Sequence, residues 1–139
     1  MSTEKVSRGF GITGGKGHKQ RIGEIGEQHA LSFLRKKGLR FVERNWRCSL
    51  GEIDLIFVDG DQLVVVEVKT RLDSKLAEQY IFMNITAKKK QKLRILSEIY
   101  FRRLHEIMGL NTLRIDVVGI ILSPRDYKVV TVQHLAAAL

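Results

Sequence analysis

The stretch Leu63-Val64-Val65-Val66-Glu67-Val68-Lys69 decides the fold of this chain. A continuous apolar run of this length predicts a central strand that is covered on both faces of a sheet. Glu67 and Lys69 interrupt the run at its end, where charge is least expected. Because they are two residues apart, their side chains share one side of the sheet. The stretch therefore predicts both a buried strand and a charged site at its end.

The preceding segment predicts an antiparallel partner for this strand. Residues 52–58 alternate as a strand, and Asp59-Gly60-Asp61 is a tight hairpin signal. If the loop is centred between Gly60 and Asp61, opposed residues have numbers that sum to 121, so Asp54 faces Glu67 directly. A register shifted by one residue would move Asp54 to the other face of the sheet.

The same alternation predicts which side chains of the partner strand share a face. One face is expected to carry Ile53, Leu55 and Phe57, and the other Glu52, Asp54 and Ile56. In this register Glu52 faces Lys69, and we expect it to pair with Lys69 or Arg71.

Two carboxylates opposed across a ladder repel each other, and burying them unpaired costs several kcal/mol. A divalent cation and a neighbouring ammonium are the natural compensators. Asp54 and Glu67 offer the hard oxygen ligands that suit Mg²⁺, and Lys69 supplies the ammonium. The alternative is a solvated face on which Glu67 and Lys69 form a surface ion pair worth ~0–1 kcal/mol.

The rest of the chain predicts one α/β domain preceded by an arm. Residues 1–21 are basic, rich in glycine and without apolar periodicity, so we expect a flexible arm followed by a single domain at 22–139. Helices are expected at 23–37, from Thr86 to Met108 and, as a short element, at 134–139. Strands are expected at 39–46, 113–122 and 127–132. The apolar stripe of the long helix is expected to consist of Leu93, Leu96, Tyr100, Leu104 and Ile107.

The charge of the chain is concentrated in two blocks. The formal net charge of +9 comes from residues 1–22 (five basic, one acidic) and 84–103 (seven basic, one acidic), since residues 23–83 carry nine basic and ten acidic groups. Such a distribution predicts a polyanionic partner, most often nucleic acid, although composition alone also permits an anionic membrane surface or an acidic protein. The absence of an apolar stretch of membrane-spanning length and the single Cys48 predict a cytoplasmic protein without a membrane partner or disulfides.

The second block is the start of the later helix. Cations crowd a helix N-terminus there, where the dipole disfavours positive charge, and a phosphate backbone would relieve this cost. We expect nucleic-acid contact through Arg71 and, on this helix, through Lys88, Lys89, Lys90, Lys92 and Arg94. The alternative is a solvated helix start. Aromatic residues are few and are not interleaved with the basic runs, which disfavours a stacking platform for single strands.

These residues resemble a known family. Asp54 followed by Glu67-Val68-Lys69 is similar to the Asp…(Asp/Glu)-x-Lys signature of the restriction-endonuclease-like, or PD-(D/E)xK, nuclease superfamily. More closely, residues 22–135 resemble the YraN-like family of bacterial predicted endonucleases, which is itself similar to archaeal Holliday-junction resolvases. The shared segments are Gly26-Glu27 with Ala30, Arg44-Asn45-Trp46-Arg47, Gly51 to Ile56, Val65 to Arg71 and Arg114 to Val118.

The resemblance implies a fold, an activity and roles for residues. It implies an αβββαβ core with a mixed sheet of about five strands flanked by helices, and a DNA endonuclease acting on branched or repair intermediates. Asp54, Glu67 and the Val68 carbonyl would bind one or two Mg²⁺ (or Mn²⁺) ions, with Lys69 acting on the attacking water or the transition-state charge. Glu27 would join the site through a metal-bound water or a second ion, unless it only places charge near a helix N-terminus.

Two further alternatives follow from the resemblance. One is a catalytically inactive module of the same fold that binds nucleic acid or recruits a partner, and a lesser one is cleavage of RNA. Because a four-way junction offers two symmetric cuts, resolvase-like relatives also imply a homodimer.

Other polar residues are expected to have structural roles. Asp116 is expected to be a hydrogen-bonding carboxylate of the core, and Trp46 and Tyr127 are expected to be packing residues. His29 is expected on the surface of the first helix, and Cys48 lacks a partner histidine at informative spacing.

Overall fold

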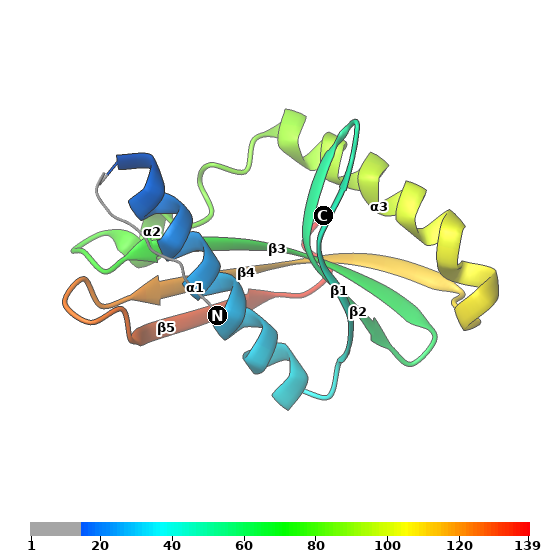
Figure 1. Cartoon of the computed structure of the whole chain (residues 1–139), viewed down its shortest axis with the longest axis horizontal. Coiled ribbons are helices and arrows are strands. Elements are labelled where there is room, and N and C mark those ends of the chain that lie inside the picture. The colour runs from blue at the N-terminus through cyan, green and yellow to red at the C-terminus, as the bar shows by residue number, and fades with distance from the viewer. Residues whose placement is uncertain (1–14) are drawn as a thin grey trace.

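The computed structural model describes residues 15–139, which form five strands and three helices (Figure 1). The elements are, in chain order, α1 (Gly15–Lys36), β1 (Arg40–Cys48), β2 (Gly51–Asp59), β3 (Gln62–Leu72), α2 (Ala77–Tyr80), α3 (Ala87–Met108), β4 (Thr112–Leu122) and β5 (Val129–Leu135).

The strands form one mixed sheet in the order β1-β2-β3-β4-β5. Neighbouring strands are antiparallel except β3 and β4, which are parallel and are connected through α2 and α3. A parallel pair needs such a crossover because the chain must return to the end at which it began. The predicted α/β class is confirmed, and the mixed sheet with flanking helices is consistent with a restriction-endonuclease-like core.

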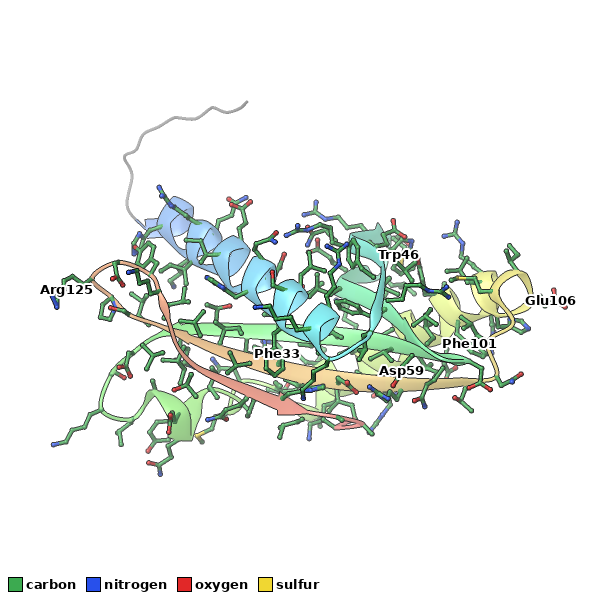
Figure 2. All side chains as sticks on the ribbon, turned by 90° about the horizontal axis from the view of Figure 1, so that it is seen from below. Phe33, Trp46, Asp59, Phe101, Glu106 and Arg125 are labelled. Carbon is green, nitrogen blue, oxygen red and sulfur yellow. The ribbon has the colours of Figure 1, made fainter. Side chains whose placement is uncertain are left out.

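Helices cover both faces of the sheet, so that β3 is buried on both sides. Val64 and Val66 belong to the hydrophobic cluster beneath α1, while Leu63 and Val65 belong to the cluster beneath α3. Figure 2 shows α1 lying along one face of the sheet. This double coverage explains the continuous apolar run, because alternate side chains enter two different cores.

The first helix differs from the expectation at its start. It begins at Gly15 rather than at residue 23, so residues 15–21 are helical and not part of an arm. Residues 1–14 of the expected arm lie outside the described residues. Glu27 consequently lies in the second half of α1, and the first turn has no acidic residue. The alternative role for Glu27, charge near a helix N-terminus, is therefore wrong.

Two further expectations at element ends are wrong. The chain continues as strand to Leu135 instead of forming a helix at 134–139, because β5 pairs with β4 as far as Val117. In α3 the apolar stripe does not continue to Ile107, which is 82% exposed; Met108 contacts the core in its place, four residues after Leu104.

The ends of α3 agree with the sequence. The side chain of Thr86 accepts a hydrogen bond from the Lys89 N–H, and Gly109 closes the helix with a left-handed φ of 67°. None of the helices within residues 15–139 has both the length and the apolar character that crossing a bilayer requires.

Candidate metal and nucleic-acid site

The site lies where β2 and β3 stop pairing. The predicted register is confirmed from Asp59–Gln62 to Leu55–Val66, where the ladder ends. One residue further, the Asp54 side chain turns to the backbone of β3, and its Oδ2 accepts a hydrogen bond from the Val68 N–H at 2.9 Å. The two strands therefore diverge beyond Leu55, and the polar ends of both strands line the opening.

Two carboxylates and one ammonium meet at this opening. The carboxyl of Asp54 lies beside that of Glu67, and the Lys69 Nζ lies 3.2 Å from the Glu67 Oε2. Burial of Asp54 and the negative charge of Glu67 together raise the pKa of its carboxyl to about 8, although the hydrogen bond from the Val68 N–H opposes both effects. The predicted approach of Asp54 to Glu67 and of Glu67 to Lys69 is confirmed. A proton or a cation would relieve the repulsion between the two carboxylates.

The backbone adds a possible third oxygen. In an extended strand the N–H and C=O groups of one residue point to the same edge. The Val68 N–H points to Asp54, and its carbonyl therefore faces the same opening between the strands. The resemblance had implied this carbonyl as a ligand, and the strand geometry places it beside the carboxylates.

A glycine brings α1 close enough for Glu27 to reach the carboxylates. A Cβ atom built on Gly26 would overlap the Oγ1 atom of Thr70 on β3, so only glycine allows this approach. The next residue, Glu27, is close enough to Asp54 for its charge to raise the pKa of the Asp54 carboxyl. The packing of α1 on β3 thus places a third carboxylate, that of Glu27, at the edge of the site.

Strand β1 holds Glu27 in place. The Asn45 Nδ2 donates a hydrogen bond to the Glu27 Oε1 at 3.2 Å, and the Arg44 Nη1 donates one to the Gln28 Oε1 at 3.2 Å. Burial raises the pKa of the Glu27 carboxyl above its ordinary value, whereas the Asn45 hydrogen bond and the charge of Arg44 lower it. Asn45 therefore fixes the orientation of a half-buried carboxylate.

Asn45 is the residue of the site that our sequence reasoning missed. It has a left-handed φ of 53° and interrupts the β1–β2 pairing between Arg44–Leu55 and Trp46–Ile53. The interruption also explains an error in the predicted faces. Ile53 packs with Ile56 beneath α3, whereas Leu55 packs beneath α1. An asparagine inside a charged strand is a signal for such a kink, because asparagine tolerates left-handed backbone better than most residues.

Two clefts meet at Glu67 and Lys69. The larger, of about 660 Å³, lies between α1, β3 and α2, and its lining includes Glu27, Asp54 and Arg71. The smaller, of about 250 Å³, lies between the start of β2 and the first turns of α3. Glu67 and Lys69 line both clefts, so the acidic site is open to each of them.

Only part of the predicted basic surface lines the clefts. Lys89 and Lys92 line the smaller cleft, where the Lys92 side chain also lies against Gly51. Arg71 lines the larger cleft. The linings do not include the other predicted contacts, which are Lys88, Lys90 and Arg94.

Glu52 does not pair as expected. Its Oε2 lies 3.0 Å from the Arg47 Nε across the β1–β2 hairpin, because Lys69 is already paired with Glu67. Glu52 still lines the smaller cleft together with Lys69, so it adds negative charge to the rim of the site.

The residues that were expected to be structural are so in the structure. Asp116 is fully buried and is hydrogen-bonded to Arg114, to His134 and to the Ala137 N–H. Trp46 packs against Tyr100, while His29 is exposed.

The donor set at the opening is small. Within residues 15–139, no group of three or more His, Cys, Asp or Glu side chains is arranged to hold a metal ion. The available ligands are two carboxylates, one backbone carbonyl and water in the clefts. This set fits Mg²⁺, which binds through one or two carboxylates and keeps several waters. It does not fit a closed structural site for zinc.

Comparisons with known proteins agree on one family. The model of the uncharacterised protein family UPF0102 matches residues 26–120. A UPF0102 protein of Chloroflexus aurantiacus is 40% identical over 121 residues, which cover 87% of this chain and 94% of the relative. A UPF0102 protein of Paenarthrobacter aurescens is 44% identical over 103 residues, or 74% of this chain and 82% of the relative. The matched region contains the whole opening between β2 and β3.

Proposed function

The chain belongs to the uncharacterised protein family UPF0102, and from the geometry of its site we propose that it is a metal-dependent endonuclease that hydrolyses phosphodiester bonds in DNA. One observation carries the proposal: Asp54 and Glu67 approach each other beside Lys69 at the junction of two clefts. Burying two carboxylates together without a cation lowers the stability of the fold, and the apolar packing of β3 does not require them.

The carboxylates of Asp54 and Glu67 and the carbonyl of Val68 would hold Mg²⁺ or Mn²⁺. When bound, the ion lowers the pKa of a coordinated water and neutralises charge on the phosphate oxygens. Asp54 keeps its hydrogen bond from the Val68 N–H through one oxygen, Oδ2, which leaves Oδ1 for the ion. The hydrogen bond thus fixes the orientation of the Asp54 carboxylate before a metal ion binds.

Lys69 and Glu27 would act on the water and the phosphate. The Lys69 ammonium is held beside the acidic pair by Glu67 at 3.2 Å, where it orients the attacking water or stabilises the charge that develops on the phosphate. Glu27 is held by Asn45 and would accept a hydrogen bond from a water on the α1 side.

Basic side chains around the clefts would bind the flanking phosphates. Lys89 and Lys92 lie on one side of Glu67, and Arg71 lies on the other. The formal net charge of +9 would add a long-range attraction for the DNA backbone. The acidic pair would thus receive a phosphate that is already held on both sides.

Cleavage of defined substrates tests the proposal. Purified protein is incubated with duplex, gapped, branched and single-stranded DNA, and with RNA, in Mg²⁺, Mn²⁺ or EDTA. We expect DNA cleavage that requires the metal and falls by about 100-fold or more in Asp54→Asn and Glu67→Gln. Glu106→Gln, on the exposed far end of α3 (Figure 2), is the matched control and should cleave normally. Activity that survives both site substitutions would contradict the proposal. Cleavage of RNA alone would mean that the substrate is RNA rather than DNA.

A second candidate function is nucleic-acid binding without catalysis. The observation that favours it is the position of Lys89 and Lys92, which could contact phosphates without any metal. Calorimetric titration with Mg²⁺ separates the two. A nuclease should bind the ion and lose it in Asp54→Asn, whereas a pure binder should show salt-dependent affinity for DNA and no metal requirement.

A further inference from the structure

The larger cleft runs along an edge of β3 that has no neighbouring strand among the described residues. β2 pairs with β3 only as far as Val66, whereas β4 accompanies it to Leu72. Residues of α1 and of the α2 segment bound the cleft on opposite faces of the sheet. Because alternate residues point to the same edge, Thr70 and Leu72 present their N–H groups to the cleft as Val68 does. The cleft is therefore a slot with hydrogen-bond donors on its floor.

The walls of this slot differ in chemistry. Lys19 of α1 and Arg71 of β3 bring positive charge to its lining. The α2 side contributes Leu76 and Tyr80, which are 50% and 38% exposed and are therefore accessible to a ligand in the cleft. Cations and an exposed aromatic side chain in one cleft match the two halves of a nucleotide, the phosphate and the base.

The size of the slot limits what enters it. A volume of about 660 Å³ lies within the range of sites that hold one drug-sized molecule, which is the size class of a nucleotide. An intact duplex stacks and pairs its bases on the inside and would lie across the mouth of the slot. A strand with unpaired bases could enter, because its bases are free to turn into the lining.

The scarcity of aromatic residues in the basic segments disfavoured a stacking platform along a single strand. The tertiary structure changes that argument, because α2 brings the ring of Tyr80 into the same cleft as Arg71 and Glu67. One aromatic ring is enough to stack one base, although it cannot serve a long strand.

We propose that this slot takes one or two unpaired nucleotides next to the phosphodiester held at Asp54 and Glu67, with a base on Tyr80 and phosphates on Lys19 and Arg71. The preferred substrate is then DNA with a single-stranded segment, such as a gap or a splayed fork. The cleavage part of this inference rests on the proposed function, whereas the binding part does not.

Binding without metal tests the slot directly. Duplex, gapped and forked DNA of one sequence are titrated in EDTA by fluorescence anisotropy, with 2-aminopurine at the unpaired position reporting stacking. We expect gapped and forked DNA to bind at least about 10-fold more tightly than duplex, with quenching of the 2-aminopurine. Tyr80→Ala should weaken gapped DNA by about 5- to 100-fold and abolish the quenching, and it should leave duplex affinity unchanged. Tyr80→Trp should restore both.

The matched control is Met83→Ala, which removes a 65% exposed side chain of the same segment that is not part of the cleft lining. It should behave as the unaltered protein. Equal affinity for gapped and duplex DNA, or gapped binding that Tyr80→Ala does not weaken, would overturn the proposal.

Adding Mn²⁺ to the same complexes separates this inference from the proposed function. Tyr80-dependent binding of gapped DNA without cleavage would support the slot and contradict the nuclease. Cleavage of intact duplex as fast as gapped DNA, unaffected by Tyr80→Ala, would support the nuclease and overturn the slot.

Discussion

The Asp54 carboxylate accepts a hydrogen bond from the Val68 N–H at 2.9 Å, one residue beyond the last pair of the β2–β3 ladder. A side chain thus takes the place of the next backbone partner. The exchange satisfies the Val68 N–H and at the same time holds Asp54 against Glu67. Regular pairing of β2 with β3 ends at Leu55–Val66, and the residues beyond it form the site.

The charge at Asp54 predicts how stability depends on pH in the absence of metal. Burial and Glu67 raise the pKa of this carboxyl to about 8, so folding favours its protonated form. Its contribution to stability is complete below the unfolded-state pKa of about 4 and is lost as pH rises through about 8. In EDTA we therefore expect the melting temperature to fall by about 3–8 °C across this window.

Asp54→Asn is the matched variant, because the amide keeps an oxygen to accept from the Val68 N–H and carries no charge. Its melting temperature in EDTA should vary less with pH, and should exceed that of the unaltered protein at pH 8.5. Mg²⁺ should stabilise only the unaltered protein. Calorimetric melts that show the same pH dependence for both proteins would argue against a buried carboxylate pair.

Asn45 is predicted to position Glu27 through its amide. Asn45→Gly keeps a backbone that accepts the φ of 53° but removes the hydrogen bond to Glu27, so the fold should persist while Mg²⁺ affinity falls by about 10-fold. The pH profile of cleavage should also shift upward, because the Asn45 hydrogen bond lowers the pKa of the Glu27 carboxyl. Calorimetric titration and pH–rate profiles measure the two effects.

Arg47→Gln is the control for this change, since it removes a β1 side chain whose ion-pair partner is Glu52 rather than Glu27. It should leave the profile in place. A glycine at position 45 that alters melting temperature but neither metal affinity nor the pH profile would assign Asn45 a purely structural role.

The approach of α1 to β3 is predicted to depend on Gly26. Gly26→Ala forces a methyl group into the Thr70 side chain and should destabilise the protein by about 1–3 kcal/mol, while moving Glu27 away from Asp54. Denaturant unfolding measures the loss.

Gly23→Ala lies in the same helix with nothing within 4 Å of the added atom, so it should leave stability unchanged or raise it by up to about 1 kcal/mol. Thr70→Ala combined with Gly26→Ala should recover part of the stability. Equal effects of the two glycine substitutions would mean that helix propensity, and not the contact with β3, governs position 26.

Two lysines of α3 are predicted to contact phosphates. Replacing Lys89 and Lys92 by Gln should weaken all DNA substrates alike and lower the slope of log affinity against log salt by about 2. The control carries the same change of charge at two exposed positions outside the cleft linings, Lys36→Gln with Arg102→Gln. If both pairs reduce the slope equally, the effect comes from net charge and not from this surface.

Local sequence determined several features of the protein. The apolar run before Glu67 made β3 a central strand, since both of its faces had to be covered. The Asp59-Gly60-Asp61 turn set the hairpin register, because the length of a tight turn leaves one pairing. The spacing of Glu67 and Lys69 put both on one side of the sheet, where they form an ion pair.

Tertiary packing decided what those residues face. The contact between Gly26 and Thr70 brings Glu27 to the site, and the left-handed Asn45 then orients it. α2 carries Tyr80 to the cleft. Each relationship joins different elements, and each depends on how helices and strands pack rather than on any local period. Periodicity repeats within one element, whereas a site is made where several elements meet.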